Sequence, residues 1–280
     1  MKGEKEMKQY FIVTDVHSFY SKMIKALEVA GYDKDNPEHI FVSLGDLFDR
    51  GDESYEMLMF VNSIPGDRKI LVRGNHEDCL EDALVRHSFR TYDYHNQTDK
   101  TIKDWYKREH PDENLDNVPT FDICEWAMKW EPYKQYISEL EEYAVIDNYV
   151  FVHGWLPFWI TDFYQLELAD RADWRDARWT NGMKSWHNGH KMKNYTVVCG
   201  HWHTSYGNSK YHYHGVQFLQ EGADYGAFGI EPYEDFDPFV DNGIIALDAC
   251  TAYSGQVNVM KVNGGSNLAE FAKYVETEQV

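Results

Sequence analysis

The chain has 280 residues, of which 43% are hydrophobic, 26% charged and 16% aromatic, and this balance excludes an intrinsically disordered protein. We expect one large domain over residues 1–280, because a chain of this length can bury a single sizeable core. The formal net charge of −20 would repel nucleic acid phosphates, so no stable nucleic acid binding is expected. The acidic surface could serve solubility or help to hold cations.

The cysteines and the N-terminal segment predict the compartment. Cys79, Cys124, Cys199 and Cys250 include no C-x-x-C pair, so we expect reduced and buried thiols. The first apolar run, residues 11–13, is too short for a signal peptide, and no stretch approaches the roughly 20 apolar residues of a membrane span. A cytoplasmic protein without membrane contact is therefore expected.

Five short apolar runs, each followed by a polar cluster, are predicted to be buried strands. In chain order they are Tyr10–Thr14, His39–Leu44, Lys69–Val72, Tyr149–Val152 and Tyr195–Cys199. Helical spacing of apolar residues predicts helices over Ser21–Ala30, Tyr55–Asn62 and Asp78–Phe89. This alternation is typical of an α/β domain, in which ligands bind at the carboxyl ends of strands. Five polar clusters at such ends indicate one shared site.

The other parts of the chain follow different patterns. Residues 90–145 are polar and aromatic, and we expect a helical insert that caps or flanks the site. After His203, residues 206–219 and 243–262 are predicted to contribute strands to a second sheet, which gives C-terminal strands over about 206–262. The tail, residues 266–280, resembles a short amphipathic helix or a frayed end.

The first two polar clusters combine carboxylates with an imidazole and a guanidinium. In the first (DVH), Asp15 and His17 would point to the same side of an extended segment and could hold one metal ion; a hydrogen-bonded strand end is the simpler alternative. In the second (GDLFDRG), Asp46 directly follows a strand, where its carboxylate could bridge two metal ions. Arg50 has the planar fork that suits phosphate oxygens. A capped turn with an ion pair would explain Asp49 and Arg50, but not the whole heptad.

The remaining three clusters add an amide and several imidazoles. The third (RGNHE) contains Asn75, whose side-chain oxygen is a neutral hard ligand, and His76, which could protonate a leaving alkoxide because the unperturbed imidazole pKa is near neutrality. The fourth (HG) contributes His153. In the fifth (GHWH), His201 and His203 flank one residue of an expected extended segment and could reach two adjacent metal ions. No motif suffices alone, but their order and placement together favour one metal site.

The five motifs, in this order, resemble those of the calcineurin-like metallophosphoesterase superfamily. The versions G-D-x-x-D-R-G and R-G-N-H-E resemble its phosphoprotein phosphatase branch, which includes bacterial and phage serine/threonine phosphatases and the diadenosine tetraphosphate hydrolases. Residues 248–256 (DACTAYSGQ) resemble the strand–turn–strand that closes the second sheet in this branch. The resemblance implies an α/β fold of two packed mixed β-sheets flanked by helices, in αββα order, to which the insert over 90–145 is added.

The resemblance also implies a dinuclear centre of two divalent metal ions. Seven matching positions would be its ligands: Asp15, His17 and His203 on one ion, Asn75, His153 and His201 on the other, and Asp46 as the bridge. Carboxylate, amide and imidazole ligands suit manganese, our first expectation, as well as iron, zinc, cobalt or nickel. The family places a hydroxide between the ions as nucleophile. Two ions about 3.5–4 Å apart lower the pKa of bound water and clamp the phosphoryl oxygens.

Roles in catalysis and substrate binding are implied for four further side chains. Arg50 would bind the phosphate, and Arg73 would support it. His76 would protonate the leaving group while Asp49 orients the imidazole ring. These assignments account for every polar residue that the motifs had singled out.

The chain departs from the family pattern at two places. The family often has glycine after D-x-H, and Ser18 at this position could narrow the first loop. A second phosphate-binding arginine is expected between the fourth and fifth motifs, where Arg175 and Arg178 are both candidates. Ion pairing on an amphipathic helix is the equally weighted alternative for these two arginines.

For two further groups of residues, a structural role is a simpler explanation than a role in metal or substrate binding. His187, His190, His212 and His214 could form another metal site, but surface histidines account for them more simply. The aromatic residues within 155–159 could form an apolar wall beside the metal ions, for a nucleobase or a peptide. Ordinary core packing is the favoured interpretation of this cluster.

The expected enzyme is a metal-dependent phosphoric ester hydrolase. The motif versions predict a phosphomonoesterase that acts on phosphoserine or phosphothreonine in proteins by attack of the metal-bridging hydroxide. The alternative is a hydrolase of dinucleoside polyphosphates or other nucleotides, which shares the same core motifs and would use the aromatic residues for base stacking. A more distant alternative is an inactive binding scaffold, which the complete set of predicted ligands disfavours.

Overall fold

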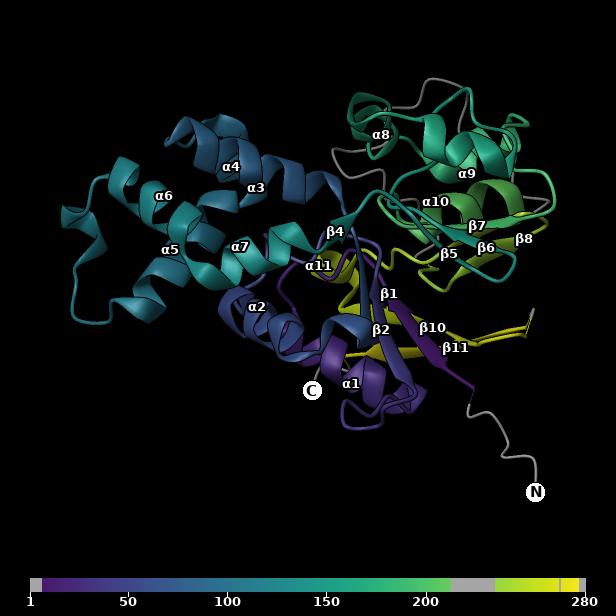
Figure 1. The fold of residues 1–280 in the computed structure, drawn as a ribbon, viewed down its shortest axis with the longest axis horizontal. Helices are drawn as coiled ribbons and strands as arrows, with labels where there is room; N and C mark the ends of the chain where they lie inside the picture. Colours follow the sequence, from purple (N-terminus) through teal and green to yellow (C-terminus); the bar gives the residue numbers. More distant parts are fainter. Residues whose placement is uncertain (1–6, 213–234, 267, 277–280) are drawn as a thin grey trace.

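Two mixed β-sheets form the centre of the computed structural model, which describes residues 7–212, 235–266 and 268–276 (Figure 1). The strands of the first sheet are β1 (Gln9–Val13), β2 (His39–Ser43), β3 (Lys69–Val72), β4 (Leu140–Glu141), β10 (Gln256–Asn263) and β11 (Ala269–Val275). Those of the second are β5 (Ala144–Ile146), β6 (Tyr149–Phe151), β7 (Thr196–Cys199), β8 (Phe239–Asp241) and β9 (Ile244–Ala246).

Parallel strands lie at the centre of both sheets. The first sheet has the order β11-β10-β1-β2-β3-β4, and the second has the order β5-β6-β7-β9-β8. Strands β1 to β4 run parallel to one another, as do β6, β7 and β9, whereas β5, β8, β10 and β11 pair antiparallel with their neighbours. The carboxyl ends of the parallel strands are therefore the positions at which a ligand site is expected.

Helices cover the outer face of each sheet. Three belong to the predicted alternation with the first strands: α1 (Tyr20–Ala30), α2 (Ser54–Ser63) and α3 (Asn75–Arg86). Four belong to the insert: α4 (Thr91–Asn96), α5 (Thr98–Glu109), α6 (Thr120–Lys129) and α7 (Glu131–Ser138). The second sheet is followed or covered by α8 (Arg171–Ala177), α9 (Gly182–His187), α10 (Thr204–Gly207) and α11 (Thr251–Ser254). Short helical turns lie at Gly66–Arg68, Leu115–Asn117, Phe163–Leu168 and Asn208–His212.

Alternating side chains of the strands divide the core into layers. In β1, Phe11 and Val13 pack with the helices on the outer face of the first sheet, whereas Ile12 packs into the cluster between the two sheets. Phe151 and Val198 reach this inter-sheet cluster from the second sheet. This is the period-two alternation of a sheet that is buried on both faces. The αββα architecture expected from the sequence is confirmed.

The insert is packed against the sheet domain by a large aromatic side chain. Trp105 of α5 is fully buried, and its ring lies 5.2 Å from that of Phe48, in the loop after β2. Figure 1 shows α4 to α7 gathered with α3 beside the sheets. The predicted helical insert over 90–145 is confirmed for residues 91–138, and its final residues form β4 and β5.

The five predicted strands and the first three predicted helices are confirmed, but two C-terminal predictions are wrong. Residues 206–212 are helical rather than extended, because Tyr206 and Tyr211 share a helical face and pack with Phe239. Residues 213–219 lie outside the described part of the chain. Within the tail, Ala269–Val275 form β11 and are neither helical nor frayed, since their backbone pairs with β10 along seven residues, whereas an isolated helix of this length is marginal in water. Residues 267 and 277–280 lie outside the described part of the chain.

All four cysteines are buried and free of disulfides, as predicted. Among the residues that the structure describes, no helix is long and apolar enough to cross a membrane.

Candidate metal centre

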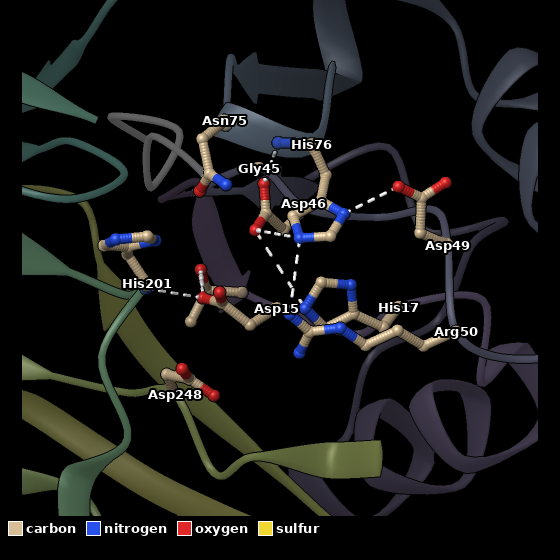
Figure 2. A network of polar contacts seen from close by, with 12 residues as sticks. Asp15, His17, Gly45, Asp46, Asp49, Arg50, Asn75, His76, His201 and Asp248 are labelled. Atoms are coloured by element: carbon tan, nitrogen blue, oxygen red, sulfur yellow. Dashed lines mark hydrogen bonds and ion pairs between the residues drawn. The ribbon is translucent and has the colours of Figure 1, made fainter. Parts of the chain in front are cut away.

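The loops at the carboxyl ends of the parallel strands converge on one point. Asp15 follows β1, Asp46 follows β2, Asn75 and His76 begin α3 after β3, and His201 follows β7. Figure 2 shows the side chains of these five residues directed toward a common centre. Helix α3 begins three residues earlier than the sequence pattern predicted. Its first turn therefore contains two of the predicted site residues, Asn75 and His76.

Left-handed backbone conformations place several of the predicted ligands that lie in loops. The φ angles of Asp15, His17, Asp46 and His201 are 52°, 52°, 54° and 65°. Hence neither D-x-H nor H-x-H is an extended segment, contrary to the expectation from the sequence. Such conformations cost about 1–3 kcal/mol each for non-glycine residues and occur mostly where a site requires them. The first loop is held in place by the His17 N–H, which donates to the Asp46 carbonyl at 3.0 Å.

Two close approaches between loops require glycine. A Cβ atom on Gly45, whose φ is +94°, would lie 2.4 Å from the backbone nitrogen of Gly74. A Cβ atom on Gly200 would lie 2.1 Å from Asp15 Oδ2. The glycines of the second, third and fifth motifs thus allow their loops to touch, which brings the ligand atoms of different strands together.

Asp46 lies at the centre of the site. Its Oδ2 atom is 3.4 Å from His153 Nε2, 3.9 Å from His76 Nε2 and 4.0 Å from His17 Nε2. Two groups of side chains, His17–Asp46–His76 and Asp46–His153–His201, have ligand atoms within 4.8 Å of one another. Asp46 is common to both groups, as a bridging carboxylate would be.

The remaining predicted ligands adjoin these two groups. Asn75 Oδ1 lies 2.8 Å from His153 Nε2. Asp15 Oδ2 accepts a hydrogen bond from the His201 N–H at 2.9 Å. His203 is outside both groups, and burial lowers its pKa to about 4 against the opposing effect of the Asp15 carboxylate.

Backbone carbonyls set the orientation of two imidazoles. His17 Nδ1 lies 2.9 Å from Phe48 O, and His153 Nδ1 lies 2.7 Å from Leu44 O. A carbonyl can only accept, so Nδ1 carries the donated proton and a neutral ring presents the Nε2 lone pair to the centre. This arrangement is typical of metal-ligating histidines.

Burial favours the neutral form of most of these imidazoles. It lowers the pKa of His17 well below its usual value and that of His201 to about 3. His153 differs: burial would lower its pKa, but the carboxylates of Asp46 and Asp15 raise it to about 10. A cation at the centre would take the place of the proton that these carboxylates attract.

Three buried carboxylates face one another around the centre. Burial and the neighbouring Asp248 carboxylate raise the pKa of Asp15 to about 8. Burial raises the pKa of Asp248 to about 6. Burial would also raise the pKa of Asp46, but His153 and His76 hold it well below the usual value. Divalent cations would offset this repulsion, so the carboxylate, amide and imidazole set fits metal ions.

Two residues of the site were not predicted from the sequence. Asp248 lies just after β9 and appears beside Asp15 in Figure 2; its position after a strand, like that of the other clusters, was the available signal. Glu77 is fully buried and ends the RGNHE motif. Its carboxylate accepts from the N–H groups of Asp46 at 2.9 Å, Leu47 at 3.1 Å and Gly74 at 2.8 Å, and so joins the second and third loops.

His76 lies between the carboxylates of Asp46 and Asp49 (Figure 2). Its Nδ1 donates to Asp49 Oδ2 at 2.6 Å, and its Nε2 lies 3.3 Å from Arg50 Nη2. Burial would lower the pKa of His76, but the Asp46 and Asp49 carboxylates raise it overall. An imidazole with a raised pKa, held by a carboxylate and directed at the centre, is suited to proton donation.

The three other predicted arginines are engaged by carboxylates. Arg73 Nη1 donates to Glu81 at 2.7 Å. Arg178 is buried and pairs with Asp78 and Glu142. Arg175 is more exposed and pairs with Asp82. These contacts correspond to the ion-pairing alternative for Arg175 and Arg178.

The aromatic residues near the fourth motif lie in different environments. Trp155 is buried, as core packing predicts, but Phe158 is 86% exposed. The sequence did not single out Trp179, in the turn between α8 and α9. Its side chain is 52% exposed, its ring centroid lies 5.8 Å from that of His201, and its backbone hydrogen-bonds the His201 ring.

The other histidines have contacts typical of structural side chains. His187 stacks on Tyr211, His190 Nε2 lies 2.8 Å from Ile160 O, and His212 pairs with Asp241 at 3.6 Å. Within the described ranges, none belongs to a group of potential metal ligands. His214 lies outside the described residues.

Comparisons with known proteins are consistent with this geometry. The family described as calcineurin-like phosphoesterase matches residues 9–229. The symmetrical bis(5'-nucleosyl)-tetraphosphatase of Psychromonas ingrahamii is 40% identical over 67 residues, which are 24% of this chain and 23% of that protein. Its counterpart in Buchnera aphidicola is 38% identical over 71 residues, covering 25% and 24%. The matched segment thus spans about a quarter of these relatives.

Among solved structures, a protein serine/threonine phosphatase from Saccharomyces cerevisiae is similar in fold. The alignment covers 98% of this chain and 81% of the yeast chain, with a TM-score of 0.50 and 12% identity. At this identity the similarity is one of fold alone.

Proposed function

This chain belongs to the calcineurin-like phosphoesterase family, and from that premise we propose that it hydrolyses phosphate monoesters with two divalent metal ions. The observation that carries the proposal is the position of the Asp46 carboxylate, which forms one group of potential ligands with His153 and His201 and lies 4.0 Å from His17 Nε2, beside the His76–Asp49 pair. Phosphoserine and phosphothreonine in proteins are the proposed substrates.

Seven side chains are proposed to hold the two ions. One ion would bind Asp15, His17 and His203, the other would bind Asn75, His153 and His201, and both would share Asp46. Manganese is the first choice, and iron, zinc, cobalt and nickel suit the same ligands. When bound, such a pair of ions lowers the pKa of a water molecule and neutralises charge on the phosphoryl oxygens.

The neighbouring side chains are proposed to bind and protonate the substrate. The guanidinium of Arg50 reaches the centre and lies 3.3 Å from His76 Nε2, where its planar fork would bind phosphate oxygens. His76 would give its Nε2 proton to the departing alkoxide. Arg73, Arg175 and Arg178 remain candidates for phosphate binding. Their observed partners support structural roles instead: Arg73 pairs with Glu81 of the helix that follows it, and Arg175 and Arg178 link α8 to α3.

The His76–Asp49 pair supports a phosphate monoester of an alcohol as the substrate. A serine or threonine alkoxide is a poor leaving group and gains most from protonation as the P–O bond breaks. A phosphoanhydride releases a phosphate oxygen, which leaves readily without a proton. A buried acid with its own carboxylate partner is therefore of most use for protein phosphates.

Trp179 favours a second candidate, the hydrolysis of dinucleoside polyphosphates. Its half-exposed ring lies next to His201, where it could stack on a nucleobase, and the two short matches to bis(5'-nucleosyl)-tetraphosphatases are consistent with this alternative. Stacking on an aromatic side chain is worth about 1–3 kcal/mol per base.

A substrate panel tests the proposal. Manganese-reconstituted protein should release phosphate from phosphoserine peptides with a kcat/KM at least about tenfold above that for diadenosine tetraphosphate, because the acid assists only the alkoxide. A phosphodiester, p-nitrophenyl phosphate and the variant Asp46→Asn complete the panel. If the protein hydrolyses diadenosine tetraphosphate but releases no phosphate from phosphopeptides, the nucleotide alternative would be the correct function.

Replacing Trp179 by leucine should separate the two substrate classes. We expect kcat/KM for diadenosine tetraphosphate to fall about tenfold, since one stacked base is lost, and that for a phosphoserine peptide to change less than about twofold. Phe121→Leu, at a comparably exposed aromatic residue of helix α6 in the insert, is the matched control. An equal loss on both substrates would show that Trp179 only supports His201, and the argument for nucleotides would fall.

A further inference from the structure

Helix α5 of the insert places two buried hydroxyl groups on the carboxylate of Asp49. Thr98 Oγ1 donates to Asp49 Oδ2 at 2.7 Å, and Thr101 Oγ1 donates to Oδ1 at 2.9 Å. The Asp49 N–H donates to Thr101 Oγ1 at 3.1 Å. Thr98 is fully buried and Thr101 is 2% exposed. The two threonines therefore hold both carboxylate oxygens and the backbone of Asp49 at once.

The hydroxyl groups belong to a firmly anchored helix. Thr98 and Thr101 are three residues apart and so share one face of α5. Ser54, at the start of α2, donates to Asp104 Oδ2 of the same helix at 2.6 Å. Trp105 buries its whole side chain next to the second-motif loop. The insert thus supplies a rigid surface beneath Asp49.

Asp49 needs such support because its backbone adopts an unfavourable conformation. Its φ angle is 73°, a conformation that non-glycine residues rarely adopt. Its Oδ2 atom accepts from His76 Nδ1 at 2.6 Å as well as from Thr98. An imidazole takes the tautomer and orientation that its Nδ1 partner dictates. The position of the Asp49 carboxylate therefore decides where His76 Nε2 points.

We propose that Thr98 and Thr101 are positioning residues, which lock Asp49 so that His76 keeps Nδ1–H on this carboxylate and directs Nε2 at the leaving group. This inference rests on the proposed phosphomonoesterase function. Hydrolysis adds the oxygen of water to phosphorus and breaks the P–O bond to the alcohol. The alcohol oxygen takes the Nε2 proton, and the proton released by the water restores the imidazole. The insert would then be part of the acid machinery as well as a flanking structure.

The leaving group of the substrate provides the kinetic test. The double variant Thr98→Val/Thr101→Val keeps the side-chain shapes and removes both hydroxyls. We expect its kcat for phenyl phosphate to fall about tenfold or more, as for other residues that orient an active-site imidazole. Its kcat for 2,4-dinitrophenyl phosphate, whose leaving group needs no proton, should change less than about threefold, with KM unchanged.

Three further variants complete the kinetic design. Thr98→Ser/Thr101→Ser keeps both hydroxyls and should retain the wild-type ratio of the two rates. Ser54→Ala removes a buried hydroxyl that binds α5 but does not contact Asp49, and should lower both rates equally or not at all. His76→Asn removes the acid itself and therefore gives the largest ratio of kcat for 2,4-dinitrophenyl phosphate to kcat for phenyl phosphate that loss of the acid can produce. An equal loss on both substrates in the double valine variant would overturn the inference.

A second measurement does not depend on activity. In the proton NMR spectrum of protein with ¹⁵N-labelled histidine, the His76 Nδ1–H should give a downfield signal, assigned by its absence from His76→Asn. We expect this signal to shift or broaden in the double valine variant and to persist in the double serine variant. An unchanged signal in the valine variant would overturn the inference. If the NMR result is as expected but the wild type hydrolyses neither aryl phosphate, the inference on Asp49 stands and the proposed function falls.

Discussion

Replacing Asp46 by asparagine should lower kcat/KM for a phosphate monoester by about a thousandfold or more. Asparagine keeps the shape of the side chain and can still accept the hydrogen bond from the His76 N–H, which is 2.8 Å long in the structure. It removes the negative charge from the atom that faces His17, His76 and His153. Metal ions contribute several kcal/mol to transition-state stabilisation, and about 1.4 kcal/mol corresponds to a factor of ten.

The metal content should fall with the activity. The wild type is expected to retain two ions per chain after dialysis, whereas Asp46→Asn should retain fewer, because one charge common to both groups of ligands is lost. Atomic emission measurements and initial rates on the same samples check both parts. Asp241→Asn, at a partly exposed carboxylate on β8, should keep wild-type metal content and activity. Full activity with full occupancy in Asp46→Asn would refute the central role of this residue.

Replacing Glu77 by alanine should destabilise the protein by roughly 4 kcal/mol or more. The carboxylate accepts hydrogen bonds from three backbone N–H groups and from the Tyr136 hydroxyl at 2.9 Å. All four donors would lose their partner inside the protein, and each buried donor without a partner costs about 1–3 kcal/mol. Burial and then repulsion from Asp46 raise the pKa of Glu77, and relief of both in the variant would offset part of this loss.

Thermal and denaturant unfolding measure the effect. For a chain of this size the expected loss corresponds to a decrease in Tm of roughly 10 °C. Activity should fall as well, because the loops that carry Asp46 and Asn75 would no longer be joined. Glu125→Ala is the matched control: this glutamate is 43% exposed and pairs with Lys129 within α6, so its removal should cost less than about 0.5 kcal/mol. Equal stability of the two variants would contradict the structural role of Glu77.

The central strands and first helices of the fold could be predicted from local sequence alone. Runs such as Tyr10–Thr14 and Tyr195–Cys199 are apolar because parallel strands are buried on both faces, so composition indicates the structure directly. The tail could not be predicted in this way. The strand β11 has partly exposed residues throughout, and its conformation depends on pairing with β10, which no local pattern contains.

The proposed metal ligands could also be singled out from sequence, since carboxylates, an amide and imidazoles recur directly after strands. Their geometry could not be predicted, because left-handed φ angles at Asp15, His17 and Asp46 are imposed by contacts between different loops. Trp179 was missed for the same reason, because it is unremarkable in its own segment and is brought beside His201 only by folding. Asp248 was missed although its position after a strand was a signal of the kind that singled out the other clusters.

The sequence by itself indicated the family through the resemblance of its five motifs, the αββα architecture that this resemblance implies, and the candidate metal ligands, because motif order and side-chain chemistry can be read along the chain. Only the tertiary structure showed which residues hold the site side chains and their loops in position. Glu77 joins two loops, and Thr98 and Thr101 reach Asp49 from about fifty residues further along the chain. Hydrogen bonds between distant segments leave no periodic signal in the sequence, since their partners meet only when the chain is packed.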